Sequence, residues 1–404
     1  MKVRRGGIFI CLALISALVA CAYQGYELPP EEETTAYSTG RMVLMVEDLP
    51  MPMSQVEYTH WITVPQSAVP PPAVEQSPVA QPPEPSANLP DISTDPAVNA
   101  AQPTAAPQAP VHQAAARYHA GISIMPPTIA QVNAFLAGNP TKRGVGYLEN
   151  GSLDTQTRQS ALNHVNNIRY IAGVPANVAW DDAKTEMAEA TAVVMVANGN
   201  INHYPARPAG ISDEVYRMAA EGARTSNLAR SSFFDVINGS IRQFLGDSER
   251  SNLPELGHRR WMLNPRLGKT AFGALGAYCV MTIMDTSNTQ AGPEHSVVMY
   301  PGQVTPVDYF QNRWPWSVSF SGEFNIRNAR AIMVRRGDGT AWQFGGGRSD
   351  GDFYINTVAF GQPGCVIFRP RGIFIKAGDV FDVQITGVLK NGRDWLVQYT
   401  VQFI

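Results

Sequence analysis

Histidines and cysteines are the side chains of this chain best suited to metal binding, proton transfer or covalent attachment. The 404 residues include seven histidines and four cysteines. A neutral imidazole binds Zn²⁺ well, and two imidazoles with one carboxylate and a water would form an open site able to activate that water. The chain contains no HExxH or CxxC run that would bring such groups together locally. A site of this kind must therefore be assembled by the fold from distant segments.

The N-terminal segment has the pattern of an export signal. Lys2, Arg4 and Arg5 precede an apolar run at 8–20 that is shorter than the roughly 20 residues of a membrane-spanning helix. The run closes on the residues Leu18-Val19-Ala20-Cys21, which resemble the lipobox of bacterial lipoproteins. The resemblance implies removal of residues 1–20 and acylation of Cys21, and several acyl chains hold a protein to a membrane firmly. A plain signal peptide with a chance cysteine is the alternative.

This anchor predicts a location in the bacterial cell envelope. In a two-membrane cell, Ala22 after the cysteine favours the outer membrane, with the protein facing the periplasm or the cell surface. In a cell with one membrane, the protein would lie on the outer face of the plasma membrane. The formal charge of −3 becomes about −6 without the three cations of the signal, and the mature chain carries no basic block. Nucleic-acid binding is therefore not expected.

A proline-rich tract separates the anchor from the rest of the chain. Residues 65–110 contain 13 prolines, no glycine and no aromatic residue. Proline favours the polyproline II conformation, at about 3.1 Å per residue, so the tract could extend on the order of 140 Å. We interpret 21–120 as a lipidated tether without a core and 121–152 as a lead-in segment.

Helical periodicity begins near residue 153. Apolar residues recur every three or four positions in four segments, and Gly173, Gly199 and Gly246 follow three of them as stop signals. We expect helices from about 153 to 172, 181 to 198, 213 to 220 and 234 to 245, followed by short strands at 270–272 and 278–283. This pattern predicts an α+β domain of helices packed on a small sheet.

Several segments of this region resemble the CAP superfamily, which includes cysteine-rich secretory proteins, antigen 5 and pathogenesis-related protein 1 and is defined by the SCP domain. They are 162–169, Gly173-Val174-Pro175, Trp180-Asp181, Ile201-Asn202-His203, Asn227-Leu228-Ala229 and, most specifically, the run from Gly257 to Pro265. The resemblance implies an α-β-α sandwich over 153–288. It also implies a cleft that holds two histidines and two acidic residues.

Matched by motif, the resemblance places the two histidines of the cleft at His203 and His258. Ser226 stands where the family has its first acid, and Asp247 is the nearest match to the second, with Glu249 and Glu255 as weaker candidates. One acidic residue of the family's set is therefore missing. The assignment requires both histidines to face one groove.

Three roles for these residues stay open. His203, His258 and Asp247 could bind a divalent metal such as zinc, although Arg259 and Arg260 beside His258 would repel a cation. Ser226 could act as a nucleophile with either histidine, if hydrogen-bond reach allows. Both rings could also be structural or orient a ligand.

After residue 290 the apolar period changes from near 3.6 to 2. Alternation is clear over 314–320, 381–385 and 395–403, and Asn391-Gly392 and Asp338-Gly339 are hairpin signals. We expect an antiparallel immunoglobulin-like or fibronectin-like β-sandwich over 289–404. Cys279 and Cys365 are the only candidate disulfide pair outside the signal and anchor, and they would tie the two domains together; buried free thiols are the alternative.

The expectation for function is a lipid-anchored, extracytoplasmic binding or envelope-interaction module with a degenerate histidine and acid cleft. Its ligand would be cell wall, lipid or protein, and catalysis is not expected. A metal-dependent hydrolase using His203, His258 and Asp247 is one alternative. A lipid- or sterol-binding protein is the other.

Overall fold

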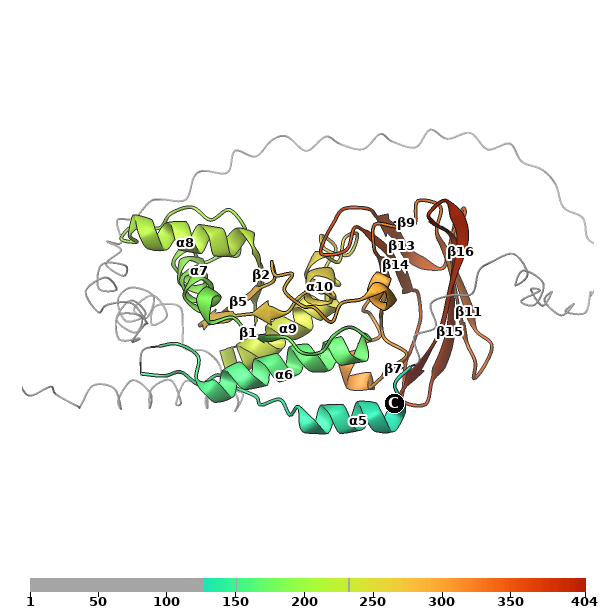
Figure 1. Ribbon diagram of the computed structural model, residues 1–404, viewed down its shortest axis with the longest axis horizontal. Helices are drawn as coiled ribbons and strands as arrows, with labels where there is room; N and C mark the ends of the chain where they lie inside the picture. Colours follow the sequence, from blue (N-terminus) through green and yellow to red (C-terminus); the bar gives the residue numbers. More distant parts are fainter. Residues whose placement is uncertain (1–125, 150, 232) are drawn as a thin grey trace, which may run out of the picture.

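The protein is described here from a computed structural model that covers residues 126–149, 151–231 and 233–404. The expected signal peptide, the acylated Cys21 and the tether lie outside these residues. A helical half and a β-rich half lie side by side (Figure 1). Within the described ranges, no helix combines the length and the apolar character needed to cross a bilayer.

The helical half contains six α-helices. Four lie at or within a few residues of the expected positions: α6 (Thr155–Ile171), α7 (Thr185–Asn198), α8 (Asp213–Arg224) and α9 (Val236–Gly246). Two were not expected, α5 (Ile129–Gly138) in the lead-in segment and α10 (Gly257–Met262). Asp154 caps α6 by accepting a hydrogen bond from the Thr157 amide, and Gly199 ends α7 at a φ of 66°.

These helices cover both faces of a small antiparallel sheet. The sheet has the strand order β2 (Ser226–Arg230), β5 (Tyr278–Thr282) and β4 (Phe272–Leu275). Helix α7 packs on β4 and β5, and α8 packs on α7. Helix α9 packs on β2, β4 and β5 and contacts α6. Strands β1 (Ala179–Trp180) and β3 (Lys269–Thr270) form a separate parallel pair, and β1 contacts α6. The helical half is therefore an α+β arrangement in three layers.

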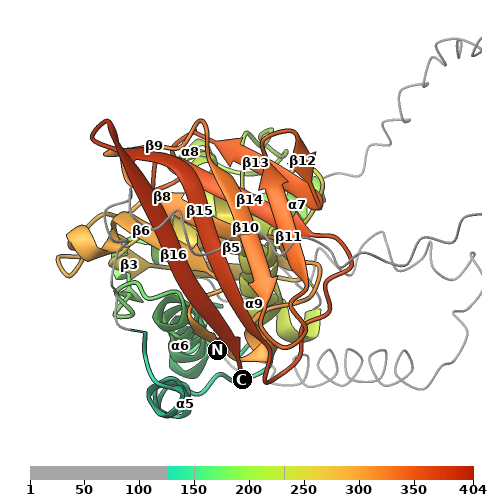
Figure 2. The same ribbon diagram turned by 90° about the vertical axis from the view of Figure 1, so that its right-hand side faces the viewer.

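The β-rich half consists of two facing sheets, as expected for a sandwich. One has the order β12-β11-β10-β15-β16-β7, with β9 paired to β15, and Figure 2 shows its outer face. The other has the order β13-β14-β8-β6. Strands of the first sheet are β7 (Val304–Thr305), β9 (Phe324–Asn325), β10 (Arg330–Arg335), β11 (Ala341–Gly345), β12 (Arg348–Ser349), β15 (Val380–Lys390) and β16 (Arg393–Phe403). Those of the second are β6 (Val297–Tyr300), β8 (Trp316–Phe320), β13 (Gly351–Asn356) and β14 (Gly364–Pro370).

Strand β8 differs from the expected alternation of buried and exposed side chains. Trp316, Val318 and Phe320 are fully buried, but Ser317 and Ser319 are buried as well. The reason is that both faces of β8 are covered. One face packs on the other sheet, and on the opposite face Ser317 accepts a hydrogen bond from Arg259 of α10. The four-stranded sheet is thus an inner layer between the helices and the outer sheet, as Figure 1 shows.

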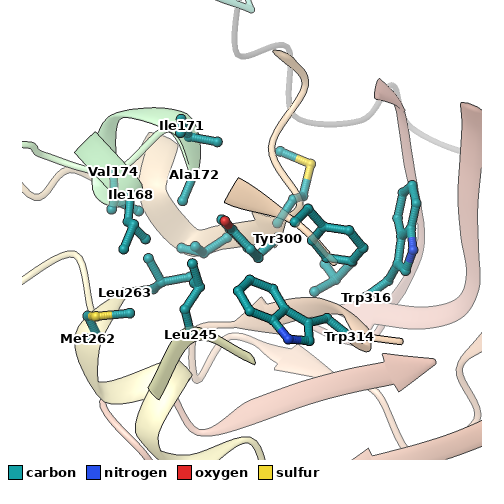
Figure 3. Close-up of a cluster of buried hydrophobic side chains, with 14 of the residues drawn as sticks. Ile168, Ile171, Ala172, Val174, Leu245, Met262, Leu263, Tyr300, Trp314 and Trp316 are labelled. Carbon is teal, nitrogen blue, oxygen red and sulfur yellow. The ribbon is translucent and has the colours of Figure 1, made fainter. Parts of the chain in front are cut away.

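One hydrophobic core crosses the expected domain boundary at 288/289. The same cluster of buried residues includes members from α6, α9 and α10 and from the first strands of the β-rich half. Figure 3 shows part of this cluster, with Tyr300, Trp314 and Trp316 from the β-rich side and Ile171, Leu245 and Leu263 from the helical side. Because burial of apolar surface is the main favourable term in folding, this shared core favours the two halves behaving as one body.

Buried arginines fasten the halves together at backbone carbonyls. The Arg259 guanidinium donates to the Leu245 and Gly246 carbonyls at the end of α9 and to the Pro315 carbonyl before β8. Arg260 donates to the Val358 and Gln362 carbonyls. Each guanidinium supplies five donors in a planar fork, which suits several carbonyls at once.

Cys279 and Cys365, the candidate disulfide pair, are free, buried thiols in this structure, which is the alternative that the sequence left open. Cys279 lies in β5 beside Ser240, within the core shared with the helices. Cys365 lies in β14, in a separate cluster with Leu253 and Leu256, and the Ser319 hydroxyl donates to its sulfur. The core and the arginines, and not a disulfide, hold the two halves together.

Candidate functional site

A pocket of about 880 Å³ opens between the two halves of the molecule. Its helical side comes from the end of β2, from α9 and from the turn that leads to α10. Its β-rich side comes from the loop before β8 and from β14. The side chains of the candidate site that line it are His203, Asp247, Glu249 and His258.

Asp247 lies at the end of α9 and its side chain is fully buried. The residue has a left-handed φ of 43°, which turns the chain out of the helix. One carboxylate oxygen of Asp247 contacts Nδ1 of His258 at 2.9 Å, and the other accepts from the His258 and Arg259 amides at 3.0 and 3.3 Å. Asp247 therefore holds both the ring of His258 and the first turn of α10.

His258 is fixed in one orientation by this contact. Because a carboxylate accepts hydrogen bonds, Nδ1 carries the hydrogen, and Nε2 is the nitrogen left for another partner. The Phe244 ring packs against the imidazole with 5.5 Å between ring centroids. Burial alone would lower the pKa of His258, but the hydrogen bond and charge of Asp247, with the charge of Glu249, outweigh it, so the pKa is raised.

His203 lies on the exposed loop after α7 and lines the same pocket. Its Nδ1 lies 2.6 Å from the carbonyl oxygen of Ala223 at the end of α8. A carbonyl only accepts, so Nδ1 donates here too, and Nε2 is again the other nitrogen. The structure thus brings both histidines to one pocket.

Ser226 and Glu255 do not line the pocket. The Ser226 hydroxyl is buried in β2 without a hydrogen-bond partner, so the pairing with a histidine that the sequence left open is not formed. Its neighbour Asn227, which the sequence did not identify as a site residue, donates to the His258 carbonyl at 3.0 Å. Glu255 is exposed in the turn before α10, where its backbone carbonyl accepts from Arg260 and its amide donates to the Asn252 carbonyl.

The candidate metal set of His203, His258 and Asp247, one of the alternatives that the sequence left open, is not assembled. Over the described ranges, no group of three or more His, Cys, Asp or Glu side chains is arranged to hold a metal ion. Both oxygens of Asp247 are already bonded to α10, and Nδ1 of each histidine is used by a protein acceptor. Arg259 and Arg260, whose charges were expected to oppose a cation, turn their guanidinium groups away from the pocket into the core.

A GxSxG run at 347–351 does not form a nucleophile site. Ser349 lies in β12 and the next strand begins at Gly351, so the run is a turn between strands and not the strand-to-helix elbow that exposes a nucleophile. Ser349 accepts a hydrogen bond from the Gly345 amide, and no histidine lines the neighbouring pocket. The run is therefore part of the β-rich scaffold.

Sequence reasoning missed the basic side of the pocket. Four arginines line it: Arg230 at the end of β2, Arg242 on α9, Arg313 before β8 and Arg369 on β14. They are too far apart in sequence to form a basic block, so only the fold gathers them. Neutral polar side chains lie between them, namely Ser231, Gln243, Ser248, Asn252 and Gln311.

Gly246 explains how the two halves approach each other so closely at the pocket. A Cβ at this position would lie 2.7 Å from Nε1 of Trp314, which any side chain would have to displace. The glycine thus lets the Trp314 indole pack on the end of α9, one residue before Asp247.

In comparisons with known proteins, no family model, no curated protein and no solved structure matches this chain.

Proposed function

We propose that this protein is a lipid-anchored, extracytoplasmic binding module of the CAP superfamily, whose ligand site is the pocket between its two halves. The three-layer helical half supports the family assignment, because the resembling segments contact one another. Arg169 of α6 donates to the Met262, Asn264 and Leu267 carbonyls, which lie in and just after the run from Gly257 to Pro265. Asn227 bonds to His258 within the same run.

The observation that carries the binding role is the composition of the pocket. It gathers two histidines and the Asp247 carboxylate with four arginines, and it holds neither a set of three metal ligands nor a paired serine nucleophile. Convergent polar groups in a concave pocket are typical of a ligand site. A site made for recognition accounts for this arrangement better than one made for hydrolysis.

The proposed location rests on the N-terminal sequence. Acylation of Cys21 would fix the chain to a membrane of the bacterial envelope, and the proline-rich tether would let the folded part reach on the order of 140 Å from that surface. Mass spectrometry of the N-terminal peptide tests this. A peptide that begins at Cys21 with a diacylglyceryl group is expected, and a free thiol at Cys21 would contradict the anchor.

The binding role is tested by co-sedimentation of the detergent-solubilised full-length protein with cell-wall fragments from the cells that make it. Gln243 lies exposed on α9 at the pocket wall, so Gln243→Trp would fill the pocket without disturbing the core. Gln398→Trp, on the exposed face of β16, is the matched control. Retention of the wild type and of Gln398→Trp, with loss for Gln243→Trp, is expected. Equal behaviour of the three proteins would refute the role of the pocket.

A further inference from the structure

The pocket carries an excess of positive charge that the protein itself does not neutralise. Its walls hold four arginines but only two carboxylates, Asp247 and Glu249. Asp247 is committed to His258 and to two amides, and Arg369 forms an ion pair with Asp352 at 2.6 Å. Arg230, Arg242, Arg313 and Glu249 therefore determine the charge that a ligand would meet.

The three remaining guanidinium groups have no carboxylate partner among the described residues. The Arg230 group lies over the Tyr278 ring, 5.7 Å from its centroid, and Arg242 donates to the Asp308 backbone carbonyl at 3.1 Å. Arg313 is exposed beside Trp314. A guanidinium keeps its charge at any physiological pH and pairs well with phosphate and carboxylate oxygens.

These arginines come from separate elements on both sides of the pocket. Arg230 and Arg242 belong to the helical half, and Arg313 belongs to the loop that enters the β-rich half. Since the shared core holds the two halves together, the three groups are presented to one ligand without a domain movement. A pocket that is already assembled before binding reduces the entropy that binding must overcome.

The size and the neutral lining of the pocket indicate more than a free anion. Ligand pockets of roughly 300 to 1,000 Å³ accept molecules much larger than one phosphate, and this one has about 880 Å³. Ser231, Gln243, Asn252 and Gln311 offer hydroxyl and amide groups that can both donate and accept. Such groups match the hydroxyls of a sugar or polyol.

The lining is a poor match to a membrane surface. Membrane-surface binding depends on apolar side chains that enter the lipid. Among the large apolar residues exposed on the described part of the chain, only Ile201 lines the pocket. Phe244 and Trp314 line it too, but both are almost fully buried.

We propose that this pocket binds a sugar or polyol carrying phosphate groups, with Arg230, Arg242 and Arg313 holding the phosphate oxygens and the neutral polar side chains contacting the hydroxyls. This inference rests on the proposed function and names the chemistry of its ligand. Glu249, which also lines the pocket, would repel a phosphate, so the phosphate oxygens are expected at the three arginines and not beside this carboxylate.

The inference is tested by calorimetric titration of the full-length protein in a non-ionic detergent, at low salt so that charges are weakly screened. Glucose 6-phosphate should bind saturably, whereas glucose and inorganic phosphate should each bind at least about tenfold more weakly, because each offers half of the contacts. Dihexanoylphosphatidylglycerol, a soluble lipid with a polyol phosphate head, should also bind more weakly than glucose 6-phosphate.

Variants of the arginines locate the binding. Arg242→Gln and Arg313→Gln should each weaken glucose 6-phosphate binding about tenfold or more, with unchanged melting temperatures, because both side chains are exposed. Arg336→Gln is the matched control, since Arg336 pairs with Asp382 on the outer sheet. Equal affinity for inorganic phosphate or for glucose, tighter binding of the lipid, or no effect of the two variants would overturn the inference.

The two proposals fail in different ways. If glucose 6-phosphate does not bind but Gln243→Trp still abolishes sedimentation with wall fragments, the ligand chemistry is wrong and the binding function stands. If Gln243→Trp neither reduces sedimentation with wall fragments nor weakens glucose 6-phosphate binding in the same titration, the pocket is not the ligand site and both proposals fail.

Discussion

The Asp247 carboxylate holds His258 twice, at Nδ1 of the ring at 2.9 Å and at the backbone amide at 3.0 Å. One buried carboxylate thus fixes the start of α10 and the orientation of the imidazole that faces the pocket. In the wild type, one carboxylate serves both the helix start and the imidazole. Asp247→Asn separates these two roles, because the side-chain amide oxygen can still accept from the backbone amides while the side chain carries no charge.

Asp247→Asn should lower the pKa of His258. The hydrogen bond and charge of Asp247 are what raise this pKa against the opposing effect of burial, so the variant leaves burial dominant. A proton NMR titration of the imidazole measures the change, with His258→Gln used to assign its signal among those of the seven histidines. Glu249→Gln is the comparison, since Glu249 acts on His258 through charge alone, and it should lower the pKa less. An unchanged His258 titration in Asp247→Asn would contradict the contact.

His258 should make the stability of the fold depend on pH. Its folded pKa lies above the ordinary value of 6.5, so the imidazolium stabilises the fold below about pH 6.5, and this contribution is lost as the pH rises through the folded pKa. The free energy of unfolding lost in His258→Gln should therefore be larger at pH 5.5 than at pH 8.5. Denaturant unfolding of both proteins at the two pH values measures it. A loss that grows with pH would reverse the sign and refute the argument.

Glu189 should contribute a second pH dependence from the other side of the helical half. Burial on α7 raises its pKa from 4.5 to about 7, although the Ser152 hydroxyl and the charge of Arg158 oppose this. The unfolded chain releases this proton at lower pH than the folded protein does, so stability falls as the pH rises from about 4.5 through about 7. Glu189→Gln should thus stabilise the protein at pH 8, on the order of 2 kcal/mol, and little at pH 4.

The control for Glu189 is Glu186→Gln, one turn earlier on α7 and exposed. It should change the free energy of unfolding by less than about 0.5 kcal/mol at either pH. If Glu189→Gln destabilises the protein at pH 8, the carboxylate makes a favourable contact that outweighs its burial, and the prediction is wrong.

Arg259→Leu should destabilise both halves together. The change leaves the Leu245, Gly246 and Pro315 carbonyls without their buried donor, which should cost about 3 to 5 kcal/mol. Because one core spans the halves, tryptophan fluorescence and far-UV circular dichroism should show a single shared transition at a lower denaturant concentration. Arg313→Leu, at an exposed side chain, should have little effect. Two separated transitions in the wild type would show that the halves unfold independently.

The elements that the sequence predicts correctly are those controlled by local chemistry. Gly199 ends α7 with a positive φ, the Asn391-Gly392 turn joins β15 to β16 with positive φ at both residues, and Phe381, Val383 and Ile385 are buried in alternation. Each depends on a few neighbouring residues. The same reasoning fails at Ser317, which is buried against Arg259 of α10, and at Ser319, which is buried against Cys365 of β14, because both partners are far away in the sequence.

The pocket shows the same division between local and distant causes. Motif matching led to His203 and His258, and the structure brings both to one pocket. Motif matching also placed Ser226 in the cleft, but its side chain is buried in β2, because the layers that pack on a strand determine which of its residues reach a pocket. Arg230, Arg242 and Arg313 lie in three separate elements, so no sequence window could gather their charges.

Cys279 and Cys365 should remain reduced and unreactive in the folded protein. Both sulfurs are fully buried, and burial raises the pKa of the Cys279 thiol to about 12 and that of Cys365 in the same direction, so little thiolate is present to react. Iodoacetamide should label neither residue in native buffer and both in denaturant, as read by peptide mass spectrometry. Ser251→Cys places a thiol at an exposed position and should be labelled within the native experiment. A non-reducing digest that yields the peptides of Cys279 and Cys365 joined together would restore the disulfide, and β5 and β14 would then have to approach each other across the cores that separate them here.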